Sequence, residues 1–455
     1  MLINRLTVGP ILGETTNSRA KIFGRGEYEM SNGQPRRGHL VIRHRRSNVA
    51  QWSAPAYFKL NPNFDMSSVA VLENLSPSQS YEYQCGYIFS EVPTEDINVS
   101  SILEWDNIPT ESFRTGTTEN KDRTVIVGSC RYILRLLGGT LFDSRGDKTF
   151  RSIFRSHEKH PVDAMIMAGD QIYADDLNVV GQDESVDDYL KRYRMAFTQP
   201  HIRKLMSSVP TYMTLDDHEI EDNWPASASP KDMVTKYPAA MHSYQIYQMS
   251  HSPLYPVDGG KITSPPEHLW YTHTDGCCDY FFTDCRTERD IANSMMISQE
   301  QMNALKAWLK DGSNRVKMII SPVPPYESTG KDKWNGFIDQ RDEILQTIES
   351  ADVKRVMFLS GDVHACMASE LNLGNAKVVS VVSSAFFWPY PHPKASHFVL
   401  KGNIATNSGN TYTVQNASRV HANDMFCRLQ ISPSNVKVEF FARKGRLKGS
   451  KTFQF

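Results

Sequence analysis

The first quarter of the chain alternates between hydrophobic and polar positions with a period of two. In the segment "YEYQCGY", Tyr81, Tyr83 and Tyr87 fall on one side of an extended chain, and Glu82 falls on the other. Further short runs, "AKIFGR", "HLVIRHR", "AYFKL" and "VAVLENL", are separated by Asn, Gly, Pro and Ser. Short strands at such intervals are typical of a β-sandwich. We therefore expect an N-terminal all-β sandwich domain over residues 1–117.

The pattern changes after the polar stretch "RTGTTENKDR" at 114–123, where we place the domain boundary. Apolar runs typical of strands then alternate with stretches typical of helices, and the chain ends in further strand-like segments. The apolar runs are "TVIVG", "DAMIMA", "TYMTL", "DYFFTD", "VKMII" and "RVMFLS", followed by "AKVVSVVSS", "MFCRLQI" and "VKVEFF". This order predicts a layered α/β domain over residues 118–455, with sheets covered by helices.

Four of the apolar runs end in polar or ionisable residues. The endings are "GSCR" (128–131), "GDQIY" (169–173), "LDDHE" (215–219) and "SGDVH" (360–364). Because ligands bind outside the carboxyl ends of strands in open α/β sheets, we expect the four endings to converge on one crevice. Gly169 lets the backbone turn without a Cβ, so that Asp170 reaches the rim of the sheet rather than its interior.

Each of these residues alone has an ordinary structural explanation. Asp170 alone would be a helix cap or a solvated loop residue, Cys130 a small buried hydrophobe, and His364 a structural histidine. Together, carboxylates, imidazoles, a thiol and a phenol at four strand ends make a set of metal ligands. Acids brought this close without cations would strongly raise one another's pKa values, and a metal resolves that conflict.

The order and spacing of these motifs resemble those of a known family. "GSC", "GDQIYAD", "LDDHEIEDN" and "SGDVH" are similar to the motif series of the PhoD-like alkaline phosphatases and phosphodiesterases, a group of calcineurin-like and purple-acid-phosphatase-like metallophosphoesterases. "VGPILGETTNSRAKIFGRG" resembles the N-terminal β-domain of that group, and "TDCRTER" and "DKWNGF" resemble later stretches. The resemblance implies a metallophosphoesterase domain with a β-sandwich core flanked by helices, preceded by the all-β sandwich.

The resemblance also implies two metal positions that share Asp170 as a bridging ligand. The implied ligands of a ferric ion are Cys130, Asp170, Tyr173 and His364. The implied ligands of an oxygen-loving divalent ion are Asp170, Asp362, and either Asp217 or Asn223. The resemblance names these ions as Fe³⁺ and Ca²⁺, with Mg²⁺ and Mn²⁺ as alternatives at the divalent position.

These features predict a metal-dependent hydrolase of phosphate mono- or diesters. Two ions roughly 4 Å apart activate a water that attacks phosphorus in line, so no protein nucleophile is required. His218 protonates the leaving oxygen or stabilises the transition state, or else it orients a ligand. Arg131 either contacts phosphate or forms a structural ion pair. Asp175 matches no ligand position, and we expect it to matter less.

Other functions stay open at this point. The main alternative is a catalytically inactive binding or scaffold protein on the same fold, which would use its N-terminal sandwich; intact ligand positions favour the enzyme. An iron oxidase would need two histidines and a carboxylate, and no such set stands out. The aromatic stretch "SSAFFWPYPHP" (383–393) either covers the site or packs in the core.

Composition limits the partners and the compartment. The 455 residues carry a formal net charge of −1, which indicates no footprint for nucleic acid or an anionic membrane, and no apolar run predicts a membrane span. We expect a small-molecule or polymeric phosphoester substrate. The N-terminal segment does not resemble a signal peptide, and the seven cysteines show no zinc-finger spacing. We therefore expect a cytoplasmic protein, or an exported one if a leader has been removed.

Overall fold

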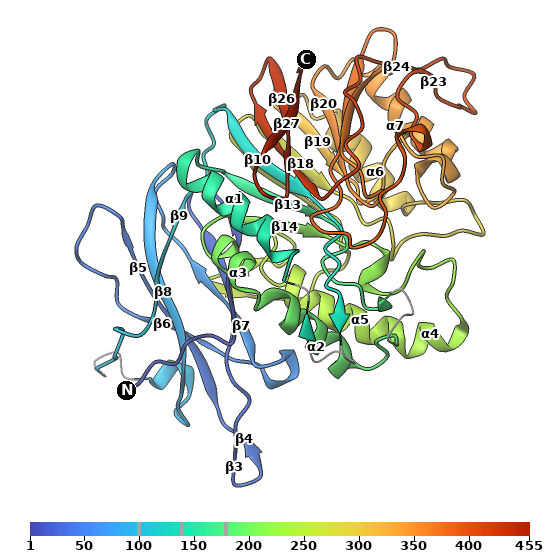
Figure 1. The fold of residues 1–455 in the computed structure, drawn as a ribbon. Helices are drawn as coiled ribbons and strands as arrows, with labels where there is room; N and C mark the ends of the chain where they lie inside the picture. The colour runs from blue at the N-terminus through green and yellow to red at the C-terminus, as the bar shows by residue number, and fades with distance from the viewer. Residues whose placement is uncertain (98–101, 137–140, 143, 177–180) are drawn as a thin grey trace.

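The computed structural model describes residues 1–97, 102–136, 141–142, 144–176 and 181–455. Its N-terminal strands are β1 (Val8–Thr15), β2 (Ala20–Arg25), β5 (Gly38–Arg46), β6 (Ala56–Lys59), β7 (Ser67–Leu72), β8 (Ser80–Phe89) and β9 (Thr110–Arg114). They form a three-stranded sheet, β1-β2-β7, and a four-stranded sheet, β6-β5-β8-β9 (Figure 1). Leu12, Ile22, Leu40 and Tyr83 belong to one buried cluster between the two sheets. The predicted N-terminal all-β sandwich is confirmed.

Two larger sheets make up the rest of the molecule. The strands of the six-stranded sheet are β14 (Thr211–Thr214), β13 (Ala164–Ala168), β10 (Arg123–Gly128), β25 (Met425–Ile431), β26 (Asn435–Ala442) and β27 (Leu447–Gln454), in that order. The strands of the eight-stranded sheet are β17 (Tyr271–Asp275), β18 (Cys278–Phe282), β19 (Val316–Ile320), β20 (Val356–Ser360), β22 (Lys377–Val382), β21 (Met367–Asn372), β24 (Thr413–Gln415) and β23 (Gly402–Asn403), also in order. Pairing is parallel along β10-β13-β14 and along β18-β19-β20-β22.

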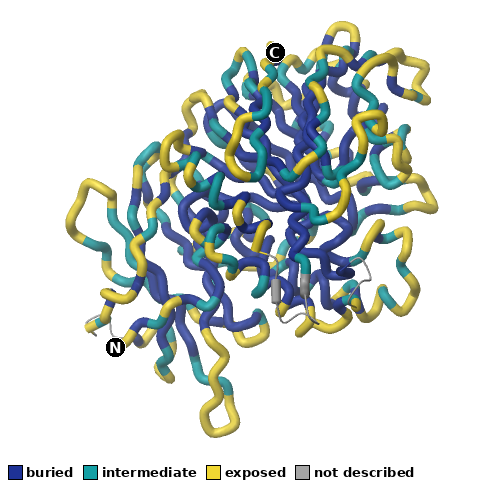
Figure 2. The backbone as a smooth tube through the Cα atoms, viewed as in Figure 1, coloured by how far each residue is buried: buried dark blue, intermediate teal, exposed yellow. Residues whose placement is uncertain are grey.

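The two large sheets pack face to face, and helices flank them (Figure 1). Val125, Ile166, Met318 and Val381, which come from both sheets, belong to one hydrophobic cluster, and the strands run through the buried interior in Figure 2. The helices are α1 (Asp147–Lys159), α2 (Val186–Phe197), α3 (Pro200–Met206), α4 (Pro230–Val234), α5 (Lys236–Tyr244), α6 (Gln299–Leu309) and α7 (Ile338–Ser350). The fold is therefore the predicted layered α/β domain with a β-sandwich core.

Six further two-residue strands complete the set of described strands. They are β3 (Met30–Ser31), β4 (Gln34–Pro35), β11 (Arg135–Leu136), β12 (Leu141–Phe142), β15 (Val257–Asp258) and β16 (Lys261–Ile262). None of the helices in the described ranges is long and apolar enough to cross a membrane. All seven cysteines are buried as free thiols.

The N-terminal sandwich packs closely against the second part of the chain. Phe23 of β2 belongs to the large hydrophobic cluster between the big sheets. The backbone N–H of Glu14 donates to the carbonyl of His251 at 2.8 Å, and Arg194 of α2 forms an ion pair with Asp65 at 2.7 Å. The proposed boundary at 117 lies between β9 and β10, and the division into two domains stays a prediction.

Candidate metal centre

The four polar strand endings lie side by side. The backbone N–H of Cys130 after β10 donates to the carbonyl of Gly169 after β13 at 3.2 Å, and that of Asp362 after β20 donates to Ser129 Oγ at 3.2 Å. Gly169 has φ +90°, and a Cβ at this position would lie 2.4 Å from the Cβ of Asp216. The glycine therefore permits both the turn and the close approach of the endings of β13 and β14.

Backbone strain is concentrated at the predicted ligands. Five of the seven have a left-handed backbone conformation, with φ between 51° and 66°. These five are Cys130, Asp170, Asn223, Asp362 and His364. Such a conformation costs on the order of 1 kcal/mol for a residue with a side chain, and clusters of this strain are typical of ligand-binding sites.

The predicted ferric ligands come together in the structure. The Sγ of Cys130 and the hydroxyl of Tyr173 lie 3.2 Å and 3.4 Å from Oδ2 of Asp170. The same hydroxyl lies 3.3 Å from Nε2 of His364. Cys130, Asp170 and Tyr173 are buried, and His364 is partly buried. A thiol, a phenol, a carboxyl and an imidazole thus surround one point.

Carboxylates form a second, overlapping cluster. One ligand atom each from Asp170, Asp217 and His218 lie within 4.8 Å of one another, and the same holds for Asp216, Asp217 and Asp362. Oδ1 of Asp170 and Oδ2 of Asp216 are buried and have no hydrogen-bond partner among the residues that the structure describes. Buried carboxylate oxygens without donors fit a bound cation, because a cation supplies the charge that the protein does not.

The pKa shifts of the clustered residues also favour a bound cation. Burial raises the pKa of Asp170 well above its usual range, and Asp216 and Asp217 raise it further. Burial also raises the pKa of Asp216 to about 8, although Arg286 opposes that shift. Burial lowers the pKa of His364 to about 3, which keeps its imidazole neutral and able to bind a metal. The donor set therefore fits hard, positively charged ions.

Asp217 and Asn223 are placed differently. Asp217 is 2% exposed and belongs to both carboxylate clusters. Asn223 is exposed, and its backbone N–H donates to Oδ2 of Asp217 at 2.8 Å. The structure thus places Asp217 inside the cluster and Asn223 beside it. Which of the two binds the divalent ion stays a prediction.

His218 is held by a residue that sequence reasoning gave no role. Its Nδ1 lies 3.0 Å from Oδ2 of Asp175, and its ring stacks on that of Tyr173 with centroids 4.2 Å apart. Oδ2 of Asp175 also accepts the backbone N–H of Asp222 at 3.0 Å. Asp175 therefore orients His218. The expectation that Asp175 matters less than the ligands stays a prediction. The contact joins residues 43 positions apart, which the sequence pattern does not reveal.

The side chain of Arg131 packs against α1. Its guanidinium lies 5.0 Å from the centre of the Phe150 ring of α1, and the residue is 1% exposed. The three guanidinium nitrogens make no hydrogen bond within the described residues, and burial lowers the pKa of Arg131 to about 10. The structure records no ion pair of Arg131 with the described residues, and the phosphate contact stays a prediction.

Comparisons with known proteins agree with this geometry. The family model described as PhoD-like phosphatase matches residues 142–419. The chain belongs to the PhoD-like phosphatase family. Alkaline phosphatase D of Bacillus subtilis (strain 168) is 23% identical to this PhoD-like chain over an alignment of 233 residues, and the match covers 45% of this chain and 39% of that protein. The match therefore spans about two fifths of the length of that relative.

A solved structure of PhoD has the same fold. It superposes with a TM-score of 0.74 at 15% sequence identity and covers 99% of this chain and 91% of that chain. The resemblance inferred from the motifs is thus confirmed at the level of family and fold.

The aromatic stretch 383–393 of this PhoD-like chain contributes both to the core and to the surroundings of the site. Phe386 and Phe387 are buried in the core, at 0% and 2% exposure. Trp388 instead stacks on His364, with ring centroids 3.7 Å apart. Phe386 and Phe387 therefore pack in the core, while the ring of Trp388 stacks on His364, one of the predicted ferric ligands.

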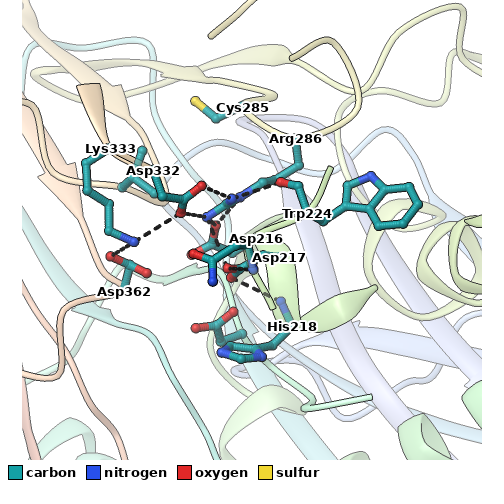
Figure 3. Close-up of polar contacts among 12 residues, drawn as sticks. Asp216, Asp217, His218, Trp224, Cys285, Arg286, Asp332, Lys333 and Asp362 are labelled. Carbon is teal, nitrogen blue, oxygen red and sulfur yellow. Dashed lines mark hydrogen bonds and ion pairs between the residues drawn. The ribbon is translucent and has the colours of Figure 1, made fainter. Parts of the chain in front are cut away.

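Sequence reasoning missed a group of buried ionic residues around the cluster. Figure 3 shows the guanidinium of Arg286 between Asp216 and Asp332. Its NH2 nitrogen lies 2.6 Å from Asp216 Oδ1, and its NH1 nitrogen lies 3.1 Å from Asp332 Oδ1. Arg286 is part of "TDCRTER" and Asp332 of "DKWNGF", stretches that the sequence marked only by their resemblance. The guanidinium of Arg286 neutralises part of the negative charge of the acidic cluster.

Glu219 is a second missed residue, with a structural task. Its carboxylate accepts the backbone N–H groups of Asp170, Gln171 and Asp216, at 3.0, 2.6 and 2.9 Å. It therefore ties the ending of β13 to that of β14. As the fourth polar residue of "LDDHE", Glu219 could be taken from the sequence only as part of a charged turn.

Proposed function

We propose that this chain is a metal-dependent hydrolase of phosphate mono- or diesters. The single observation that carries the proposal is the buried cluster of donors from four strand endings, in which Oδ1 of Asp170 has no protein donor among the described residues. Family membership supports the same reaction class. The proposed substrate is a phosphoester, either a small molecule or a polymer.

The proposed ions are Fe³⁺ and a divalent ion, Ca²⁺ in the first instance and Mg²⁺ or Mn²⁺ as alternatives. Fe³⁺ is assigned to Cys130, Asp170, Tyr173 and His364, since a thiolate and a phenolate are strong donors to it. The divalent ion is assigned to Asp170, Asp362, and Asp217 or Asn223, all of which offer oxygen. When bound, two such ions lower the pKa of a water at the site and neutralise charge on phosphoryl oxygens.

His218 is proposed to supply the proton to the leaving oxygen. Burial by itself lowers the pKa of His218, but Asp217 and Asp170 outweigh it and raise the pKa well above the usual range. The carboxylate of Asp175 holds the proton on Nδ1, so that Nε2 carries the transferable proton. The protein side of the reaction then consists of a positioned acid and the charges that orient the phosphate.

The experiment that tests this function is hydrolysis of p-nitrophenyl phosphate and bis-p-nitrophenyl phosphate, with metal content measured on the same sample. We expect release of p-nitrophenol from at least one of the two by protein that carries iron and a divalent ion. A metal-loaded, folded protein that hydrolyses neither ester would favour the binding or scaffold alternative.

The ferric assignment predicts a coloured protein. Thiolate and phenolate bound to Fe³⁺ give charge-transfer absorption in the visible range, so Tyr173→Phe should weaken or shift the band and leave the fold intact. Cys130→Ser should do the same and also lower the iron content, because sulfur is replaced by a poor neutral ligand. Absorption spectra and iron analysis of the purified variants measure both effects.

The matched control is Tyr132→Phe. The ring of Tyr132 contacts that of Tyr173 with centroids 4.9 Å apart, but its hydroxyl donates to Asp176 at 3.0 Å and is not a proposed ligand. Its spectrum should equal that of the wild type. A colourless wild type that is active with Mg²⁺ or Mn²⁺ alone would refute the ferric assignment and leave the phosphoesterase in place.

A further inference from the structure

Lys333 lies at the edge of the candidate metal centre and has no task in the function proposed above. It directly precedes the 3-10 turn Trp334–Gly336, in the segment that follows β19. Trp334 is fully buried, and its indole N–H donates to Ser321 Oγ at 2.9 Å. This anchor fixes the backbone beside the cluster, and the Nζ of Lys333 reaches Asp362 Oδ2 at 2.6 Å and Asp332 Oδ2 at 3.2 Å (Figure 3).

Lys333 is more exposed than the neighbouring cation, Arg286, and makes fewer polar contacts. The guanidinium of Arg286 is 0% exposed and contacts Asp216, Asp332 and the carbonyl of Trp224. The side chain of Lys333 keeps 13% exposure, and its recorded ion pairs within the described residues are those with the two carboxylates. An ammonium has three donors, so Lys333 retains capacity for one more acceptor on its open side.

The two carboxylates that Lys333 contacts have other partners. Asp332 also contacts Arg286 and Arg289. Asp362 is a proposed ligand of the divalent ion. An ion bound there would share the negative charge of this carboxylate with Lys333. Once the ion is in place, the positive charge of Lys333 is less compensated than in the metal-free protein, and an anion at the site would compensate it.

We infer that Lys333 binds the phosphoryl oxygens of the substrate and makes the site prefer the doubly charged phosphate of a monoester over the singly charged phosphate of a diester. The inference rests on the proposed function. The physical reason is charge: a compact ammonium gains more from a dianion than from a monoanion at the same distance. Lys333 is thus a specificity-determining residue at the divalent side of the site.

The test compares the two esters in a Lys333→Gln variant at a pH where the monoester is a dianion. We expect kcat/KM for p-nitrophenyl phosphate to fall by about 10- to 100-fold, mostly through KM, because a charge-assisted hydrogen bond is lost. For bis-p-nitrophenyl phosphate we expect a fall of less than about 5-fold. Lys333→Arg keeps the charge and should keep most of the preference.

The matched control is Lys331→Gln. Lys331 lies two residues earlier, is exposed, and makes no recorded ion pair with the described residues, so the same charge is removed from the same segment. Neither ester should be affected. Calorimetric titration of the metal-loaded protein with inorganic phosphate measures binding separately from turnover. Lys333→Gln should weaken phosphate binding about as much as it raises KM, with the metal content unchanged.

The outcomes separate this inference from the function on which it rests. If the metal-loaded wild type hydrolyses neither ester, the proposed function is refuted. If the wild type is active, equal losses on both esters, no loss on either, or a loss of bound metal in Lys333→Gln overturns only the role of Lys333. A selective loss on the monoester, recovered by Lys333→Arg, supports it.

Discussion

Replacing Asp170 by asparagine should reduce phosphoester hydrolysis by at least about 10³-fold, because bound ions supply several kcal/mol of the transition-state stabilisation and Asp170 is proposed to hold both. The fold should survive. Burial and nearby acids raise the pKa of Asp170, so the metal-free protein disfavours its charged form, and a neutral asparagine fits the same place. We therefore expect the metal-free melting temperature to stay the same or rise while activity and metal content fall.

Asp163→Asn is the control for this prediction. Asp163 precedes β13 at its other end, where its carboxylate accepts the backbone N–H of Thr124 at 2.8 Å, and asparagine can still accept that bond. Its activity should stay near that of the wild type. Asp362→Asn should behave like Asp170→Asn. Near-normal activity of Asp170→Asn with unchanged metal content would reject the ligand assignment.

Replacing Arg286 by methionine should lower the unfolding free energy of the metal-free protein by about 3–5 kcal/mol, since it leaves buried carboxylates without their counter-charge. Arg286 and Asp216 are both 0% exposed, and the guanidinium also donates to the carbonyl of Trp224 at 3.0 Å. Urea unfolding followed by circular dichroism measures the change. Adding Asp216→Asn to the same variant should recover part of the loss, because it removes one uncompensated charge.

An exposed ion pair serves as the reference for Arg286. Lys354 pairs with Asp352, and both side chains are more than half exposed. Lys354→Met should change the unfolding free energy by less than about 1 kcal/mol. A loss of that small size in Arg286→Met, or no recovery on adding Asp216→Asn, would show that the buried ionic group does not support the fold as argued.

The sequence predicts what depends on local pattern. The run "MFCRLQI" is β25 (Met425–Ile431) and "AKIFGR" is β2 (Ala20–Arg25), because alternation and apolar runs decide strands within a few residues. The glycine–aspartate ending at Gly169 predicts the turn, because the chemistry that permits the turn lies in adjacent residues. Parallel strands then bring such endings to the same edge of the fold.

What the sequence did not predict depends on contacts between distant segments. Arg286 meets Asp216 across 70 positions and Asp332 across 46, and no spacing rule links them. Asp175 reaches His218 only through the packing of the endings of β13 and β14. Arg131 stands next to Cys130 in the sequence, yet its side chain packs against α1. Proximity in the chain fixes the backbone position of such a residue and leaves the direction of its side chain to tertiary packing.

The central claim is that the buried donor cluster holds the ions on which hydrolysis depends. Its most direct test removes the metals from the wild type with a chelator. Metal content, folding by circular dichroism and hydrolysis of the two nitrophenyl esters are then measured. Iron and calcium are added back, and the measurements are repeated. We predict that the stripped protein stays folded and loses hydrolysis, and that about two ions per chain restore it in the wild type but not in Asp170→Asn. Hydrolysis that persists at full rate in folded, metal-free protein would contradict the account.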